Sequence, residues 1–459
     1  MADSKKYRSQ ATGWPANNFA GLGLSGLFLI LFAISIITST LLSQWTSQAV
    51  SGIMGRYLGT GSLLLCIGSY FLIAFTLKET RGLKLLFLAA NLLVTVLCIL
   101  NFWGIDPLLM YSNLTPEQYS FFLGTVGNKN VTSNYLCMVV SCQLVMFYFT
   151  KNKNSKALYA VLSVIGIYAG YAASSDSFLL GCAGAFLVLL WISAKEHCLR
   201  VRFLQTIFLF YISTWIMKLT LIVADVGNIN APFIREYPKD GLLGSILYIR
   251  ILIAAGIILT AFSLTERNIG KNMDSKSAIR IRNWTFGLLS VTGICFLLLI
   301  ICVNSETDFP YLRYLQEHLL LTDDFGSNRG YIWKRAWEVF YHSPLTEKLF
   351  GCGPACFFMK MSEEYGREME VLYGAPFADA HNEFLQILIT TGITGVIGYF
   401  GFFISSMLTM VRKADRDSAS AIGATVILAF LFQGVVNNPQ IFTTPILFAF
   451  LGIVSVYCN

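Results

Sequence analysis

The chain has 459 residues, of which 55% are hydrophobic and only 13% are charged, and its mean hydropathy is +0.62. An ordinary soluble domain carries about 25% charged residues, so most of this chain does not face water. The net charge of +7 does not indicate nucleic-acid binding, because the basic residues form short clusters between apolar runs rather than one stripe.

Apolar runs long enough to cross a bilayer recur along the whole chain. A helix needs about 20 apolar residues to cross the hydrocarbon core, and its backbone groups must bond within the helix. We therefore expect an all-α membrane protein with about twelve transmembrane helices. The first run is longer than a signal-peptide core, which indicates an uncleaved first span. The runs lie near 19–42, 61–77, 83–104, 131–150, 156–172, 175–193, 203–224, 243–264, 284–303, 383–411, 419–436 and 440–457.

Lysine and arginine residues are concentrated in every second connection between these spans. Such clusters mark the cytoplasmic side of a membrane protein. We therefore expect both termini in the cytoplasm. The basic set comprises Lys5, Lys6, Arg8 and the loops near 78–84, 151–156, 195–202, 267–282 and 412–416. The opposite connections carry only Arg56, Lys129, Arg235 and Lys239 outside the insert described next.

A polar insert of about 80 residues separates the ninth and tenth spans and faces outward in this topology. Loops longer than about 12–15 residues are usually functional or disordered, and the mixed aromatic, glycine and proline content here argues against disorder. The sequence thus predicts three regions: nine helices in 1–303, an extracytoplasmic catalytic loop in 304–382 and three helices in 383–459.

At one end of the insert, Arg329, Trp333 and Trp337 are spaced so that they share one face of a helix. Asn328 or Ser327 can cap that helix. Two interpretations are open. The helix lies at the membrane surface with its indoles at headgroup level, or Arg329 provides a fork for phosphate oxygens.

At the other end of the insert lies His381, one of four histidines. Asp379 as the N-cap of the tenth span would place His381 and Asn382 in its first turn, where helix N–H groups attract anions. A neutral histidine there can also accept a proton from a hydroxyl. A polar cap that only satisfies the helix end is the alternative.

The tenth span carries glycine every three residues, at Gly392, Gly395, Gly398 and Gly401. Small residues at such spacing let helices approach closely. We therefore expect the helix that follows His381 to be held firmly by its neighbours.

Two cations lie within predicted spans. Lys218 is about six residues and Arg250 about seven residues from an outer end, which places both roughly 10 Å below the outer surface. Intramembrane charges are costly and usually face a cavity or a partner. Either Lys218 snorkels or pairs with Asp225, or these cations and Arg235 line an outward cavity suited to a pyrophosphate.

Two further pairs in the insert carry weaker signals. Cys352 and Cys356 could close a small disulfide on an oxidising face or remain free thiols. Asp323 and Asp324 resemble the paired carboxylates that hold a metal ion in some sugar-nucleotide transferases, but two residues are not enough to predict a metal site.

Several short motifs follow one another in a characteristic order. Together they resemble the O-antigen ligase and polymerase superfamily of polytopic membrane glycosyltransferases. Members often have Ser-Arg-Gly where this chain has Asp176-Ser177. The motifs are Gly124-x-x-Gly127-Asn128-x-Asn130, Ala173-Ser174-Ser175-Asp176-Ser177, Arg329-Gly-x-x-Trp333, Gly351-x-Gly353, His381-Asn382-x-x-Leu385 and Gly392-x-x-Gly395.

The resemblance implies a GT-C-like enzyme of the bacterial cytoplasmic membrane that needs no cofactor and no metal. The donor would be a glycan on a polyprenyl pyrophosphate, commonly undecaprenyl, and the acceptor a lipid core, another glycan or a protein. His381 and Arg329 would be catalytic. We expect Arg329, His381 and Arg250 to converge at the outer membrane surface. The residues expected to bind the pyrophosphate are Arg250, Arg235, Lys218, Asn382 and Trp333.

Three alternatives remain at this point. The motifs do not separate a ligase from a polymerase. A lipid-linked glycan flippase is a second class, although transporters tend to show internal repeats, and none is convincing here. A peptidoglycan-type polymerase fits the arginine, tryptophan and histidine pattern less well.

Overall fold

The computed structural model describes residues 23–53, 56–77, 81–304 and 319–458. The basic N-terminal cluster and residues 305–318 of the insert lie outside the described residues. The described chain is almost entirely helical, apart from a two-stranded antiparallel hairpin formed by β1 (Phe122–Leu123) and β2 (Gly127–Asn128). The expected all-α membrane fold is confirmed.

The predicted spans appear as separate helices. In the described part of the chain, nine helices are long and apolar enough to cross a membrane, and three shorter apolar helices accompany them. Each of them overlaps one of the twelve predicted runs. They are α1 (Gly23–Leu42), α3 (Thr60–Thr76), α4 (Arg81–Phe102), α5 (Lys129–Phe149), α6 (Lys153–Ala172), α7 (Asp176–Ser193), α8 (His197–Val226), α11 (Ile249–Asn268), α12 (Ser275–Asn304), α17 (Glu383–Lys413), α18 (Ser418–Gly434) and α19 (Thr444–Cys458).

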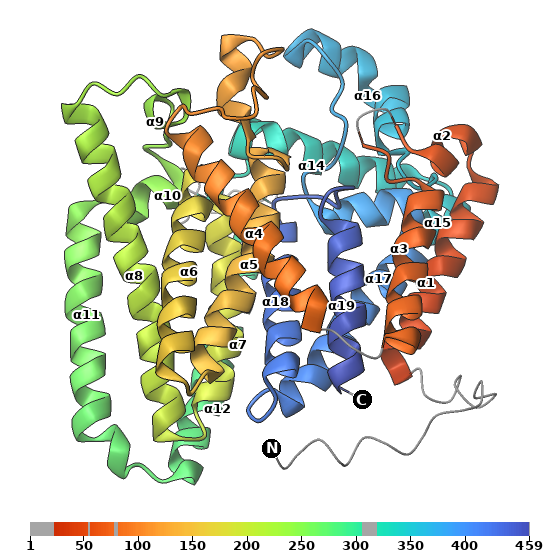
Figure 1. The fold of residues 1–459 in the computed structure, drawn as a ribbon. Coiled ribbons are helices and arrows are strands. Elements are labelled where there is room, and N and C mark those ends of the chain that lie inside the picture. The colour runs from red at the N-terminus through yellow and green to blue at the C-terminus, as the bar shows by residue number, and fades with distance from the viewer. Residues whose placement is uncertain (1–22, 54–55, 78–80, 305–318, 459) are drawn as a thin grey trace.

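Shorter helices fill the connections. Most of them gather at one end of the bundle, whereas α1 begins and α19 ends at the other (Figure 1). The charge distribution likewise predicts that both termini lie at the same end of the bundle, opposite the insert. The short helices are α2 (Thr46–Ser51), η2 (Pro116–Phe121), α9 (Pro232–Arg235), α10 (Gly241–Ile246), η3 (Gly270–Asn272), α14 (Phe325–His342), α15 (Leu345–Phe350) and α16 (Phe357–Tyr373).

The helices differ sharply in burial. α5 is enclosed by α6, α7 and α18, and almost every one of its residues is buried. In contrast, α11 and α12 expose large apolar side chains such as Phe262 and Leu288 along nearly their whole length. An apolar exterior is expected where lipid rather than water is the solvent, so these two helices form a lipid-facing edge of the bundle.

Glycines on α17 fit against α1, as their spacing predicts. A Cβ added at Gly398 would come within 2.6 Å of the backbone nitrogen of Phe32, and one at Gly401 within 2.5 Å of the Phe28 ring. The two helices can approach this closely only because neither position carries a side chain.

Gly392 differs from the other glycines of α17, because the helix breaks there. Its φ of +68° and ψ of −171° are not helical. In a continuous helix, the carbonyls of Ile389 and Thr390 would accept hydrogen bonds from the backbone N–H groups four residues further along. Here they accept hydrogen bonds from the backbone N–H groups of Cys352, at 3.0 Å, and Gly353, at 3.1 Å. The insert is thus fixed to α17 by backbone contacts.

We expect Gly392→Ala to destabilise the protein. The added Cβ would lie 2.4 Å from the Leu349 backbone, and positive φ at this position costs a non-glycine residue about 1–3 kcal/mol. Thermal unfolding of the detergent-solubilised protein should therefore begin several degrees lower. Gly293→Ala in α12 is the matched control, because nothing lies within 4 Å of its added Cβ. Equal unfolding temperatures for the two variants would contradict the packing described here.

Candidate functional site

His381 lies in the turn that leads into α17, in contact with a buried carboxylate. Its Nδ1 is 3.3 Å from Oδ1 of Asp379, and its backbone N–H donates to the same oxygen. Asp379 is only 3% exposed, and its Oδ2 lies 2.6 Å from the Arg56 guanidinium. That contact is an ion pair rather than a well-directed hydrogen bond, because Oδ2 has no partner of hydrogen-bond geometry. A cation from the loop before α3 therefore holds the carboxylate that contacts His381.

The expected cap of α17 is wrong. Asn382, not Asp379, is the N-cap, because its side-chain oxygen accepts from the Leu385 N–H at 2.9 Å. His381 precedes the helix and has a φ of +45°, outside the helical region. The sequence pointed to Asp379 because aspartate is a common N-cap. Burial beside Arg56 gives this carboxylate a different role, which is to contact the imidazole.

Arg329 begins the regular part of α14. Gly326, Ser327 and Asn328 all have positive φ and form a left-handed turn, so the expected capping by Ser327 or Asn328 does not occur. Nη1 of Arg329 donates to the carbonyl of Gly326 at 2.5 Å, whereas its buried Nε has no hydrogen-bond partner among the described residues. A half-buried guanidinium with a free donor is suited to bind an anion.

Charges from several elements act on these two groups. Burial lowers the pKa of the His381 imidazole; Asp379 opposes this effect, while Arg329 and Arg56 add to it. Burial also lowers the pKa of the Arg329 guanidinium, and Asp379 and Asp176 oppose that effect. The net result is a histidine that stays neutral at lower pH than usual, beside a cluster of positive charge.

Trp333 and Asn382 support this turn from inside the protein. Nε1 of Trp333 donates to the carbonyl of Ala380 at 2.9 Å. The Asn382 amide caps α17 and also donates to the carbonyl of Val435 at 2.9 Å. Both side chains thus already bond within the fold. Trp337, two turns along the helix from Arg329, is 53% exposed.

Motifs that are distant in the sequence meet in pairs at this end of the bundle. Ser175 donates its hydroxyl hydrogen to Oδ1 of Asn130 at 2.7 Å, so the serine-rich turn contacts the segment before α5. Asp176 accepts from the Leu243 N–H at 2.8 Å, which ties α7 to α10. The Asp176 carboxylate also acts on the Arg329 guanidinium.

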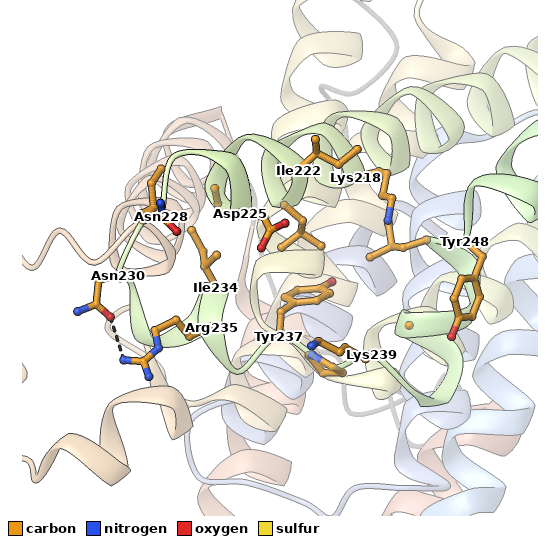
Figure 2. Close-up of a pocket in the computed structure, with 16 residues that line it drawn as sticks. Lys218, Ile222, Asp225, Asn228, Asn230, Ile234, Arg235, Tyr237, Lys239 and Tyr248 are labelled. Carbon is orange, nitrogen blue, oxygen red and sulfur yellow. Dashed lines mark hydrogen bonds between the residues drawn. The ribbon is translucent and has the colours of Figure 1, made fainter.

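Lys218 and Arg235 line an open cavity of about 950 Å³ between the end of α8 and the helices α9 and α10 (Figure 2). Lys218 lies eight residues before the end of α8, close to the predicted depth. Within the described residues it forms no ion pair, with Asp225 or any other group. Lys239 joins these two cations.

Arg250 joins neither the residues around His381 nor the cations that line the cavity. The predicted span began near residue 243, but the structure places α10 there and begins α11 only at Ile249. Arg250 therefore lies in the first turn of an exposed helix, not about 10 Å below its end. The prediction of its depth is wrong because hydropathy does not distinguish a short apolar helix from the end of a span.

The weaker pairs in the insert have separate roles. Cys352 and Cys356 are buried free thiols, and Cys356 lies within 3.9 Å of the Ser43 hydroxyl. Asp323 pairs with Lys334 at 2.8 Å. In the part of the chain that the structure describes, no three potential metal ligands of the histidine, cysteine or carboxylate type come together.

Sequence reasoning missed the roles of Arg56 and Asp176. Arg56 carried a signal, because it is one of few cations in the outward connections, and a charge left there needs a reason. Asp176 carried a signal in its departure from the motif. Neither signal identifies a partner, because Arg56 and Asp379 are separated by more than three hundred residues and meet only in the folded chain.

The fold and this site define a multi-pass membrane protein with a histidine, a buried carboxylate and two arginines at one end of the helical bundle. Residues 241–400, from α10 into α17, match the family model described as O-antigen ligase. The match covers about a third of the chain, and it supports the resemblance to the O-antigen ligase and polymerase superfamily and, in general terms, to a membrane glycosyltransferase of that type. No curated protein matches the chain.

The pKa of His381 should respond to its two neighbours with opposite sign. Asp379→Asn removes the one charge that raises this pKa and should lower it further, whereas Arg56→Gln removes a charge that lowers it and should raise it. NMR titration of protein labelled at histidine Cε1 measures both shifts, with the signal assigned from His381→Gln. Asp323→Asn is the control and should change nothing. Shifts of the same sign in both variants would contradict the arrangement.

Proposed function

We propose that the protein transfers a glycan from a polyprenyl pyrophosphate, such as undecaprenyl pyrophosphate, to an acceptor hydroxyl on the outer face of the bacterial cytoplasmic membrane. The observation that carries the proposal is the contact of His381 with buried Asp379, beside an Arg329 guanidinium that retains a free donor. Both termini then lie in the cytoplasm, and residues 304–382 form an extracytoplasmic catalytic loop.

His381 acts as the general base. Its Nδ1 faces Asp379, which favours the tautomer that donates to the carboxylate and leaves Nε2 free to accept a proton. Nε2 takes the proton of the acceptor hydroxyl as its oxygen attacks the anomeric carbon of the donor. The bond from that carbon to the pyrophosphate oxygen breaks, and its electron pair leaves with the pyrophosphate. Asp379 stabilises the imidazolium that forms.

Arg329 takes up the negative charge that develops on the leaving pyrophosphate. Guanidinium groups bind phosphate oxygens through paired N–H donors, and positive charge fixed in place before the reaction stabilises the transition state. Arg56 lies close enough to affect His381 and adds to this charge. In this scheme side chains supply the positive charge, and no metal ion is required.

The cations predicted to hold the pyrophosphate fall into different places. The leaving group must lie beside the reacting carbon and hence beside His381. We therefore assign the pyrophosphate to Arg329 and Arg56, and not to Arg250 on the lipid-facing edge. Lys218 and Arg235 line a cavity beside α10, where another part of the substrate would bind.

A transporter is the competing class, and a broken membrane helix is one of its marks. α17 does break at Gly392. However, the carbonyls exposed by the break bond to Cys352, Gly353 and the Ser39 hydroxyl, and do not line an open ion site. The break therefore anchors the catalytic insert, which favours an enzyme over a transporter.

One assay separates the two transferase reactions. Purified protein would be supplied with an oligosaccharide on undecaprenyl pyrophosphate and with separate acceptors. A ladder of products on the carrier lipid indicates a polymerase. A single transfer to a lipid core or to a protein indicates a ligase. Absence of transfer from any lipid-linked donor would refute the proposed function.

His381→Ala and Arg329→Ala should each reduce transfer by about 100-fold or more without lowering the amount of protein in the membrane, because each removes a group needed in the transition state. The yield and length of the glycan product measure the effect. His342→Ala is the matched control, since this exposed histidine contacts the Glu338 carbonyl and the Tyr341 ring on its own helix. A normal product from either site variant would refute the assignment.

The pH dependence of transfer should report the same histidine. Neutral His381 is the active form, so the rate should be constant at neutral pH and fall only below pH 6.5, because the pKa is lowered. In Asp379→Asn the fall should begin at still lower pH. The measurement is kcat/KM against pH for both proteins. A fall that does not move in the variant would exclude His381 as the titrating base.

A further inference from the structure

The cavity of Figure 2 is a feature that the proposed reaction does not use. It lies between the end of α8, the following turn, α9 and α10. A volume of about 950 Å³ is at the upper end of the range of small-molecule sites and far larger than a pyrophosphate group needs. The lining residues include three cations, Lys218, Arg235 and Lys239, and one carboxylate, Asp225.

The positive charge of this cavity is not neutralised from within. Three cations face one carboxylate, which leaves a net charge of +2. Arg235 donates to Oδ1 of Asn230, a neutral group, at 2.9 Å. Among the described residues no ion pair holds Lys218, Arg235 or Lys239. Unpaired cations around a concave site attract an anion and raise its local concentration.

The uncharged lining residues are suited to a carbohydrate. The amides of Asn228 and Asn230 can donate to and accept from hydroxyl groups. The Tyr248 ring is 54% exposed and offers a flat apolar face with a polar edge, against which a sugar ring can pack. In Figure 2 Lys218, Arg235 and Lys239 lie on different sides of the cavity, so they would contact an extended ligand at several points.

α10 connects this cavity to the site around His381. Gly244 lines the cavity, and the neighbouring Leu243 donates its N–H to Asp176. The Asp176 carboxylate in turn acts on Arg329. A ligand in the cavity would therefore contact the same short helix that bonds to Asp176.

We propose that the cavity is a specificity subsite for an acidic sugar, bearing a carboxylate or phosphate, in the glycan that the enzyme transfers. The inference rests on the proposed glycosyl transfer and adds the charge of its substrate. An anionic lipid headgroup has the same charge, but it offers neither the several hydroxyl groups nor the ring faces that the asparagine and tyrosine residues would recognise.

The test is direct binding to the full-length protein in nanodiscs of phosphatidylcholine, measured by calorimetry. The probes are trigalacturonic acid and its neutral methyl ester. We expect the acid to bind at least tenfold more tightly than the ester, and added salt to reduce the difference. Equal affinities, or no binding of the acid at millimolar concentration, would overturn the proposal.

Three variants locate the site. Arg235→Gln and Lys239→Gln should each weaken binding of the acid several-fold. Arg250→Gln is the matched control and should bind normally, because this exposed arginine does not line the cavity. Asp225→Asn should tighten binding, since it removes the only lining carboxylate, and a folding defect cannot produce a gain of affinity. Unchanged affinity in all three cavity variants would overturn the proposal.

Two further arms separate the alternatives. Phosphatidylglycerol in the nanodisc should not change the affinity for the acid. If this lipid displaces the acid, the cavity is a lipid site instead. His381→Ala should still bind the acid. If the protein transfers acidic and neutral glycans equally well, this inference is wrong and the proposed function stands. If the protein binds the acid more tightly than the ester but transfers no glycan, the cavity prefers an acidic ligand and the proposed function is wrong.

Discussion

The structure depends on one exchange of backbone hydrogen bonds, at the break in α17. A helix inside a membrane cannot leave carbonyls unpaired, because unpaired polar groups in lipid cost several kcal/mol each. The insert supplies the missing N–H groups from Cys352 and Gly353, and glycine at 351 and at 392 lets the two backbones meet. A polar segment between two membrane helices is thereby bonded to the backbone of one of them, and its position is fixed.

This attachment explains how the site is assembled. α14 contacts α17, and the charge of Arg329 acts on His381. The Trp333 indole holds that turn through the carbonyl of Ala380. Arg56, in the loop before α3, forms an ion pair with Asp379. Each charged group thus belongs to a different segment, and the firm joint at Gly392 keeps them together.

Charge is divided into two regions at this end of the bundle. Around His381 the cations lie among carboxylates and are partly buried, which suits a reaction in which charge develops. In the cavity near Lys218 the cations are unpaired and more open to water, which suits recognition of a charged ligand. Asp176 stands between these regions. A donor that spans both would be held at its reacting end and recognised along its glycan.

The sequence by itself determined the apolar spans and the polar insert between the ninth and tenth of them, and it predicts an outward position for that insert and catalytic roles for His381 and Arg329. Hydropathy and loop charge are local properties, so a single sequence reveals them. Only the tertiary structure decided that Asp379 contacts the imidazole and does not cap α17, that Arg56 is its partner, and that Arg250 lies apart. These outcomes depend on contacts between residues far apart in the chain and on where a helix begins. Composition and spacing do not directly encode long-range contacts or the residue at which a helix begins.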